Sequence, residues 1–426
     1  MTSTPERNEP LSLPQGLTDA EHASPTVFVD TNGIDLRRAD GRSLENVNAA
    51  LLEALRRVCD SPLAEQVLPS GQTLLKVHVG EPKCSTRMRP EYARAAVAFS
   101  RERGATVVAG DTTVAYTGRR GHKDNPLGNA RTYLGLAREQ GWAEGRAAGV
   151  PFVVLDRPST GVEGVFEFQG EEQRNVVDGI QRFRDFYLAE GFAAADFVVN
   201  YAHLTMHGLA GVAGCVKSLA MGCSSLRGKL RMHQALLPHF DAELCAVCGR
   251  CIEHCPENAL SLPEGAPCPE VDPERCIGCG ECVAICSLSK DAVRLRDEEV
   301  CDWERGESTL PGRMADYTLG LMNGRWARTV HVLHLYSVTS LCDCINHPQK
   351  PMFGRDLGFL VGWNPFAIDA IAGRMLTNAL REEGHPVEEN TGLRTAEQAA
   401  VHARDAYGIL PSTPVQTVIV PKGTLA

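Results

Sequence analysis

The sequence lacks three features that would assign it to common classes of protein. It has no run that approaches the roughly 18 consecutive apolar residues of a membrane-spanning helix, so we expect no membrane contact. It has no basic excess, because 53 acidic and 43 basic residues give a formal net charge of −10, which argues against nucleic acid as a partner. Residues 1–25 lack a basic segment followed by an apolar one, so we expect no signal peptide and predict a cytoplasmic location.

Common catalytic and nucleotide-binding motifs are absent as well. The sequence has no P-loop, no G-x-G-x-x-G loop after a strand and no G-x-S-x-G nucleophile elbow. Its composition is nevertheless globular, with 43% hydrophobic and 23% charged residues, which excludes a disordered or fibrous chain. At roughly 150 residues per domain, the length of 426 residues indicates about two to three domains.

What the sequence does have is cysteine. Nine of its sixteen cysteines lie in the 42 residues from Cys245 to Cys286, and eight of these nine form two regularly spaced runs. In a small secreted protein this density would suggest disulfide bonds. In a long chain without a signal peptide it indicates reduced thiolates that hold metal.

Outside this segment, short apolar runs alternate with helical patterns. Strands are expected at residues 27–29, 73–79, 106–109, 151–155, 197–200, 331–335, 357–361 and 417–420. Helices are expected at residues 43–58, 91–100, 129–140, 174–190 and 367–380, the last beginning at Asn364-Pro365. This alternation predicts an α/β fold with a largely parallel or mixed sheet and flanking helices.

The cysteine-rich segment contains the spacing C-x2-C-x2-C-x3-C twice, beginning at Cys245 and at Cys276. This is the spacing of bacterial ferredoxins with two 4Fe–4S clusters, in which the fourth cysteine of each run reaches the other cluster. The predicted ligands are Cys245, Cys248, Cys251 and Cys286 for cluster one, and Cys276, Cys279, Cys282 and Cys255 for cluster two. A pair of zinc sites is the less favoured alternative, because zinc ribbons use cysteines in pairs.

These patterns divide the chain into four parts. Residues 1–25 are expected to form a flexible tail. Residues 26–240 and 291–426 are expected to form one α/β domain, interrupted by a small α+β ferredoxin-type insert at residues 241–290.

Motifs on both sides of the insert occur in the order of one family. They are Lys76-Val77-His78-Val79-Gly80-Glu81, Gly110-Asp111-Thr112-Thr113, His203 with His207, Met221-Gly222-Cys223, Cys342-Asp343-Cys344 and Asn364-Pro365-Phe366-Ala367-Ile368-Asp369. Over about residues 73–375 the sequence resembles the DUF362 family of iron–sulfur centre proteins. The resemblance implies an α/β domain with an inserted ferredoxin module and leaves the reaction open.

Six polar residues outside the insert are candidates for a catalytic pocket. Lys76 and His78 lie near the end of one predicted strand and Asp111 follows another, and ligands of open α/β sheets gather at strand ends. His203 and His207 would share a face of a helix, although the glycines after them favour a loop that binds an anion, to which Lys217 would add charge. Local turns, salt bridges and structural histidines are the alternative interpretation.

A third metal site is a further hypothesis. Cys342 and Cys344 would point to the same side of a strand, or share a metal in a loop. Together with Cys223 they would supply three ligands to a third iron–sulfur cluster or another metal. Buried, inert cysteines are an equally weighted alternative.

The function predicted from these observations is an iron–sulfur oxidoreductase. Electrons would pass through two 4Fe–4S clusters to a small-molecule substrate in the α/β domain, and a ferredoxin, flavodoxin or reductase would be the electron donor or acceptor. One alternative is an electron-transfer protein that serves a partner enzyme. Another is a non-redox enzyme that uses an open cluster iron as a Lewis acid.

Overall fold

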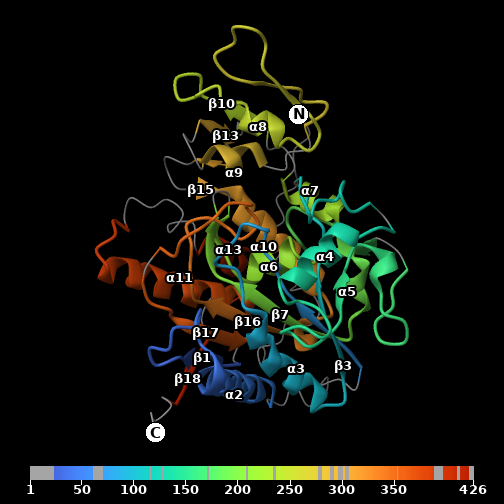
Figure 1. Ribbon diagram of the computed structural model, residues 1–426, viewed down its shortest axis with the longest axis vertical. Helices are drawn as coiled ribbons and strands as arrows, with labels where there is room; N and C mark the ends of the chain where they lie inside the picture. Colours follow the sequence, from blue (N-terminus) through green and yellow to red (C-terminus); the bar gives the residue numbers. More distant parts are fainter. Residues whose placement is uncertain are drawn as a thin grey trace.

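A mixed sheet of eight strands forms the centre of the protein (Figure 1). The computed structural model describes residues 24–60, 71–115, 117–126, 128–169, 172–207, 210–233, 237–276, 281–287, 292–295, 301–302, 307–352, 354–387, 397–409 and 413–421. In sheet order the strands are β18 (Val415–Ile419), β1 (Thr26–Asp30), β17 (Gly358–Gly362), β16 (Thr329–Leu335), β7 (Phe197–His203), β2 (Gln72–Lys76), β3 (Thr106–Asp111) and β4 (Phe152–Val154).

The sheet confirms the predicted α/β class. Five of its seven strand pairs are parallel, and β17 alone runs against both of its neighbours. Five strands precede the cysteine-rich segment in the sequence and three follow it. The chain before the cysteine-rich segment and the chain after it therefore contribute strands to the same sheet.

Helices cover both faces of the sheet because successive strand residues point to opposite sides. In β2, Leu75 belongs to a core with α2 (Gly41–Cys59), α3 (Ala93–Arg101) and α4 (Arg131–Glu139). Its neighbour Leu74 belongs to a second core with α6 (Cys215–Ala220), α7 (Leu226–His233), α10 (Thr309–Met322) and α13 (Gln398–Tyr407). The helix α11 (Pro365–Glu382) packs over β16 and β17 on a third core.

The start of α11 agrees with the sequence-based prediction. The Asn364 side chain accepts hydrogen bonds from the backbone N–H groups of Phe366 and Ala367, at 3.0 and 3.1 Å, and Pro365 occupies the first helical position. An asparagine cap satisfies N–H groups that have no partner within the helix, and proline lacks an N–H at a position where none is needed.

The helix predicted at residues 174–190 is wrong. The segment instead forms the antiparallel hairpin of β5 (Glu172–Val176) and β6 (Asp185–Ala189), followed by the short helix α5 (Glu190–Ala194). Gly179 in the connection has a φ of 92°, which a helix does not allow. On β6, the alternate residues Phe186 and Leu188 are buried in the core, so the apolar residues follow the period of a strand.

The cysteine-rich module lies at one end of the protein, beyond α7 and α10 (top of Figure 1). Its elements are β10 (Pro238–Phe240), α8 (Arg250–Glu253), β11 (Leu260–Ser261), β12 (Glu270–Val271), α9 (Glu281–Ser287) and β13 (Val293–Leu295). Strand β10 pairs with β13, and β11 pairs with β12, both antiparallel. The chain therefore enters and leaves the module through the two-stranded ribbon of β10 and β13.

Smaller elements complete the described structure. They are the hairpin of β8 (Thr205–His207) and β9 (Gly211–Ala213), the pair of β14 (Cys301–Asp302) and β15 (Glu307–Ser308), and 3-10 helices at Pro90–Tyr92, Pro158–Thr160 and Trp326–Arg328. Of the tail predicted at residues 1–25, residues 1–23 lie outside the described part of the chain.

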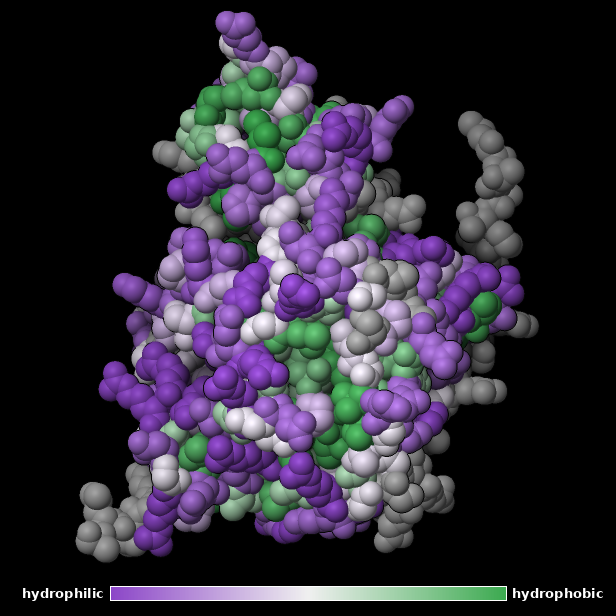
Figure 2. Space-filling view, turned by 45° about the vertical axis from the view of Figure 1, so that its right-hand side comes forward, coloured by the Kyte–Doolittle hydropathy of each residue, from purple (hydrophilic) through white to green (hydrophobic). Residues whose placement is uncertain are grey.

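Hydrophilic residues cover most of the face shown in Figure 2, and apolar residues gather in its middle and at its upper end, where the module lies. Leu244, Val247 and Leu262 of the module are 37–44% exposed. Among the described residues, no helix has both the length and the apolar character that crossing a membrane would need.

Candidate functional site

The cysteine-rich module is built from two copies of one hydrogen-bonded unit, 31 residues apart. The Asp241 side chain accepts from the backbone N–H groups of Glu243 and Leu244, and Cys245 N–H donates to the Asp241 carbonyl. Asp272 makes the same set of bonds to Glu274, Arg275 and Cys276. The repeat of the cysteine spacing is thus a repeat of the local fold.

Four cysteines of the module line one cavity. They are the predicted ligands of cluster one, Cys245, Cys248, Cys251 and Cys286, although the last lies 35 residues after the third. Backbone N–H groups donate to three sulfur atoms of the module: Val247 to Cys245 at 3.4 Å, Ala259 to Cys255 at 3.2 Å and Ala292 to Cys286 at 3.2 Å. Such bonds stabilise the negative charge of thiolate ligands.

The predicted ligands of cluster two are only partly described. Cys255, Cys276 and Cys282 are half-buried in the module, whereas Cys279 lies outside the described residues. Gly249, which follows Cys248, has a φ of 73°, so a glycine there allows the backbone to turn between two cysteines of the first run.

A second and larger cavity lies at the carboxyl ends of β2, β3 and β7, with a volume of about 980 Å³ that includes its opening to solvent. All six candidate pocket residues line it: Lys76, His78, Asp111, His203, His207 and Lys217. The chain leaves β2 toward β3 on one side and returns through β7 on the other. Open α/β sheets bind ligands at such a reversal of strand order.

Asp111 organises the floor of this pocket. Its carboxylate accepts from Lys76 Nζ at 2.9 Å, Arg120 Nη2 at 3.2 Å and the Tyr133 hydroxyl at 2.5 Å. Burial opposes the charge of Asp111, but Lys76 and Arg120 outweigh burial and hold the pKa of the carboxyl below its usual range. Asp111 therefore stays ionised and fixes two cations at the pocket wall.

The surroundings of two pocket histidines shift their pKa values in opposite directions. Burial, reinforced by Arg120, lowers the pKa of His78 to about 3, so this ring is neutral. His203 Nδ1 lies 2.6 Å from Asp343 Oδ2 and Nε2 lies 2.7 Å from the Tyr336 carbonyl oxygen. Both partners are acceptors, and although burial opposes charge, Asp343 raises the pKa of His203. Asp343 and the Tyr336 carbonyl thus favour the protonated form of the His203 ring.

Lys229 is a buried lysine whose only acceptors in the described hydrogen bonds are neutral. Its Nζ donates to Thr112 Oγ1 at 2.9 Å and to the Ser224 carbonyl at 2.6 Å. Burial lowers the pKa of Lys229 to about 8, with Asp156 and Asp111 opposing this. A lysine with such a pKa exchanges a proton near neutral pH, which suits acid–base work in the pocket.

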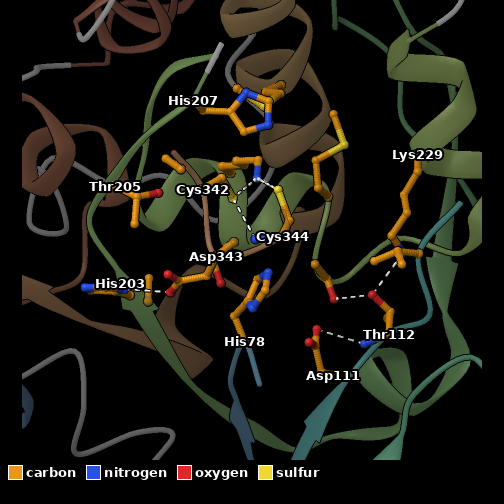
Figure 3. A pocket seen from close by; sticks show the side chains of 18 of the residues that line it. His78, Asp111, Thr112, His203, Thr205, His207, Lys229, Cys342, Asp343 and Cys344 are labelled. Atoms are coloured by element: carbon orange, nitrogen blue, oxygen red, sulfur yellow. Dashed lines mark hydrogen bonds and ion pairs between the residues drawn. The ribbon is translucent and has the colours of Figure 1, made fainter. Parts of the chain in front are cut away.

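Cys342 and Cys344 form the opposite wall, in the loop between β16 and β17. Lys217 Nζ donates to Cys342 Sγ at 3.1 Å and lies 3.8 Å from Cys344 Sγ (Figure 3). Burial opposes ionisation of Cys342, but the Cys344 thiol and the Lys217 ammonium outweigh it and lower the pKa of Cys342 to about 5.

The third member of this cysteine group differs from the predicted one. One ligand atom from each of His207, Cys342 and Cys344 lies within 4.8 Å of the other two. Cys223 is not in this group; it is buried in the apolar core, and burial raises the pKa of its thiol to about 12. Thus the structure puts His207 where the sequence placed Cys223.

Sequence reasoning missed two basic residues of the pocket. Arg120 bonds Asp111 and Glu81, and Lys229 lies on α7. With Lys76 and Lys217 they make four basic residues in the lining, against the two aspartates Asp111 and Asp343. Neither residue stands at a recognisable strand end or in one of the motifs quoted above.

One loop joins the pocket to the cysteine-rich module. Arg120 lines the pocket, and three residues later Lys123 Nζ lies 3.1 Å from Glu257 Oε1 and donates to the Pro256 carbonyl. Apolar side chains also connect the module to the pocket, because Leu260 and Val293 of the module share a core with Leu310 of the pocket lining.

The fold and the site define an α/β protein with a cysteine-rich module beside a buried pocket rich in basic residues. The family described as "Domain of unknown function (DUF362)" matches residues 73–374, and the chain belongs to this family. No curated protein and no solved structure matches the chain.

Proposed function

We propose that the protein is an iron–sulfur oxidoreductase that acts on an anionic small molecule. The observation that carries the proposal is the cavity of the module: the four cysteines that the ferredoxin spacing assigns to cluster one, drawn from two separate runs, line it together. Zinc ribbons use cysteines in pairs, so a zinc site would not explain why a cysteine of the second run lines this cavity with three of the first run.

The cysteine residues would hold two 4Fe–4S clusters, one at Cys245, Cys248, Cys251 and Cys286 and the other at Cys255, Cys276, Cys279 and Cys282. A 4Fe–4S cluster, when bound, supplies one-electron redox chemistry. The N–H groups that donate to the sulfur atoms of Cys245, Cys255 and Cys286 are partners of the kind that orient cluster ligands.

The residues of the pocket support an anionic substrate. Lys76 and Arg120 are fixed by Asp111, so their positive charges are oriented before a ligand binds. Lys229 is placed to give or take a proton at Nζ, because its pKa of about 8 lies near neutral pH. The electron donor or acceptor would be a ferredoxin, flavodoxin or reductase that meets the module. The 42 residues from Cys245 to Cys286 carry seven acidic residues against two arginines, so the module would favour a basic docking surface on this partner.

Anaerobic purification with iron and sulfide analysis tests the proposal. We expect about eight irons per chain, four for each cluster, and an EPR signal after reduction. Cys248→Ser is expected to lower the iron content, whereas Cys268→Ser, in the linker between the two cysteine runs, is expected to retain it. Full iron content in Cys248→Ser would refute the ligand assignment.

A second measurement addresses the substrate. The reduced protein is mixed with a panel of reducible carboxylates and phosphate esters, and loss of the EPR signal is followed. Reoxidation by an anionic compound that saturates with its concentration supports an enzyme. If only protein acceptors reoxidise the clusters and no small molecule binds, the protein serves electron transfer alone.

A further inference from the structure

Three side chains of the types that bind soft metals meet on one wall of the pocket, outside the cysteine-rich module (Figure 3). Cys342 and Cys344 are buried and follow β16, whereas His207 is partly buried and ends β8. Segments 135 residues apart in the sequence therefore bring their ligand atoms within 4.8 Å of one another. Exposed acidic groups are common without a metal ion, whereas two of these three ligands are buried thiols.

The ligand atoms are also oriented by donors. The Lys217 ammonium donates to Cys342 Sγ, and the backbone N–H of Cys344 donates to the same sulfur at 3.3 Å. The N–H of Ala210 donates to His207 Nδ1 at 3.1 Å and holds the ring in place. The lone pairs of the sulfur atoms thus face a positive charge inside the pocket, as they would face a cation.

We propose that His207, Cys342 and Cys344 bind one zinc ion, with the fourth coordination position open to the pocket. Two thiolates and an imidazole are soft and intermediate ligands that favour zinc, and three protein ligands with one open position are typical of catalytic zinc sites. Bonds of about 2.3 Å to sulfur put two sulfur atoms about 3.8 Å apart in a tetrahedral site. From at most 4.8 Å, each pair of ligand atoms needs to close by only about 1 Å.

The open position defines the ligand class. Two thiolates neutralise the charge of the zinc ion, so the excess of four basic residues over two aspartates in the lining still favours a negatively charged molecule. The site takes an oxygen atom of an anionic carboxylate or phosphate compound, which the zinc ion polarises as a Lewis acid. In naming that ligand the inference rests on the proposed function, whereas zinc binding stands on the three ligands alone.

X-ray absorption at the zinc edge tests the site in the cluster-containing protein. The anaerobic protein is treated with a chelator and then given one equivalent of Zn²⁺. We expect two sulfur neighbours at about 2.3 Å and two nitrogen or oxygen neighbours at about 2.0–2.1 Å. Iron and sulfide are measured on the same samples, so loss of the clusters and loss of the zinc site are read separately.

Matched variants locate the ion. Because loss of partners behind a ligand already weakens metal affinity 10- to 100-fold, Cys344→Ser is expected to weaken zinc binding by more than about 100-fold and to leave one sulfur neighbour. Cys223→Ser, the buried cysteine outside the group, is expected to change neither.

Three outcomes would overturn the proposal. The first is no zinc binding at one equivalent by protein with full iron content. The second is four sulfur neighbours, which would put the ion in the module. The third is an unchanged ligand shell in Cys344→Ser whose iron content and circular dichroism match those of the wild type.

Discussion

Replacing Lys229 by methionine is expected to stabilise the folded protein at neutral pH. The lysine is 8% exposed, and burial lowers its pKa from 10.5 to about 8. At about 1.4 kcal/mol per pH unit, keeping this buried lysine charged costs about 3 kcal/mol. The substitution also removes two hydrogen bonds, to Thr112 Oγ1 and the Ser224 carbonyl, which contribute about 1 kcal/mol each. The expected net gain in the free energy of unfolding is therefore about 1 kcal/mol.

The dependence on pH gives the sharper form of this prediction. Below pH 8 the lysine is charged in the folded and the unfolded chain, so its full cost is present. Between pH 8 and pH 10.5 only the unfolded chain holds the proton, and the stability of the wild type rises with pH relative to Lys229→Met. Above pH 10.5 Lys229 is neutral in the folded and the unfolded chain. The cost of burying its charge is then absent, whereas its hydrogen bonds still stabilise the folded protein.

Urea denaturation under anaerobic conditions, followed by far-ultraviolet circular dichroism near pH 7 and near pH 10, measures both effects. Lys350→Met, at an exposed lysine, is the control and is expected to show little change at either pH. The same stability difference between wild type and Lys229→Met at both pH values would refute the burial argument. So would a Lys229→Met protein that is less stable than the wild type at pH 7.

Three other substitutions test the network and the packing, each by the free energy of unfolding in urea. Asp111→Asn leaves Lys76 and Arg120 as buried cations without a full counter-charge, so we expect a loss of about 3–5 kcal/mol; a loss below 1 kcal/mol would contradict the ion pairs. Asn364→Ala removes the cap of α11 and is expected to cost about 1 kcal/mol, and Asn364→Ser is expected to restore most of it. Gly320→Ala adds a methyl group that overlaps the Phe186 ring and is expected to cost about 1–3 kcal/mol, unlike a substitution at a glycine with open space around it.

The strands of the sheet were predictable because they are buried on both faces. Short apolar, β-branched stretches such as residues 197–199 in β7 mark strands covered by helices on both sides, and they stand out in the sequence. The hairpin of β5 and β6 was not predictable in this way. Its apolar residues fit the spacing of a helix as well as that of a strand, and packing of Phe186 against Tyr317 of α10 decides between them.

The pocket was partly predictable for a related reason. Lys76, Asp111 and His203 end neighbouring strands, and parallel strands bring their carboxyl ends to one edge. In contrast, the sequence did not allow us to predict that His207, and not Cys223, lies beside Cys342. Cys223 follows α6 and turns into the core, whereas β8 carries His207 back over the cysteine loop, and no local pattern encodes that path.

The buried charged groups of the pocket do not favour the stability of the fold, and this is the strongest sign that the pocket serves a function. Buried ion pairs such as Lys76 with Asp111 rarely stabilise more than apolar residues of the same volume, and a buried Lys229 with neutral hydrogen-bond partners is destabilising at pH 7. Local inconsistency of this kind concentrates at functional sites. An apolar core would hold β2, β3 and β7 together at least as well, so these charges are explained by what the pocket binds.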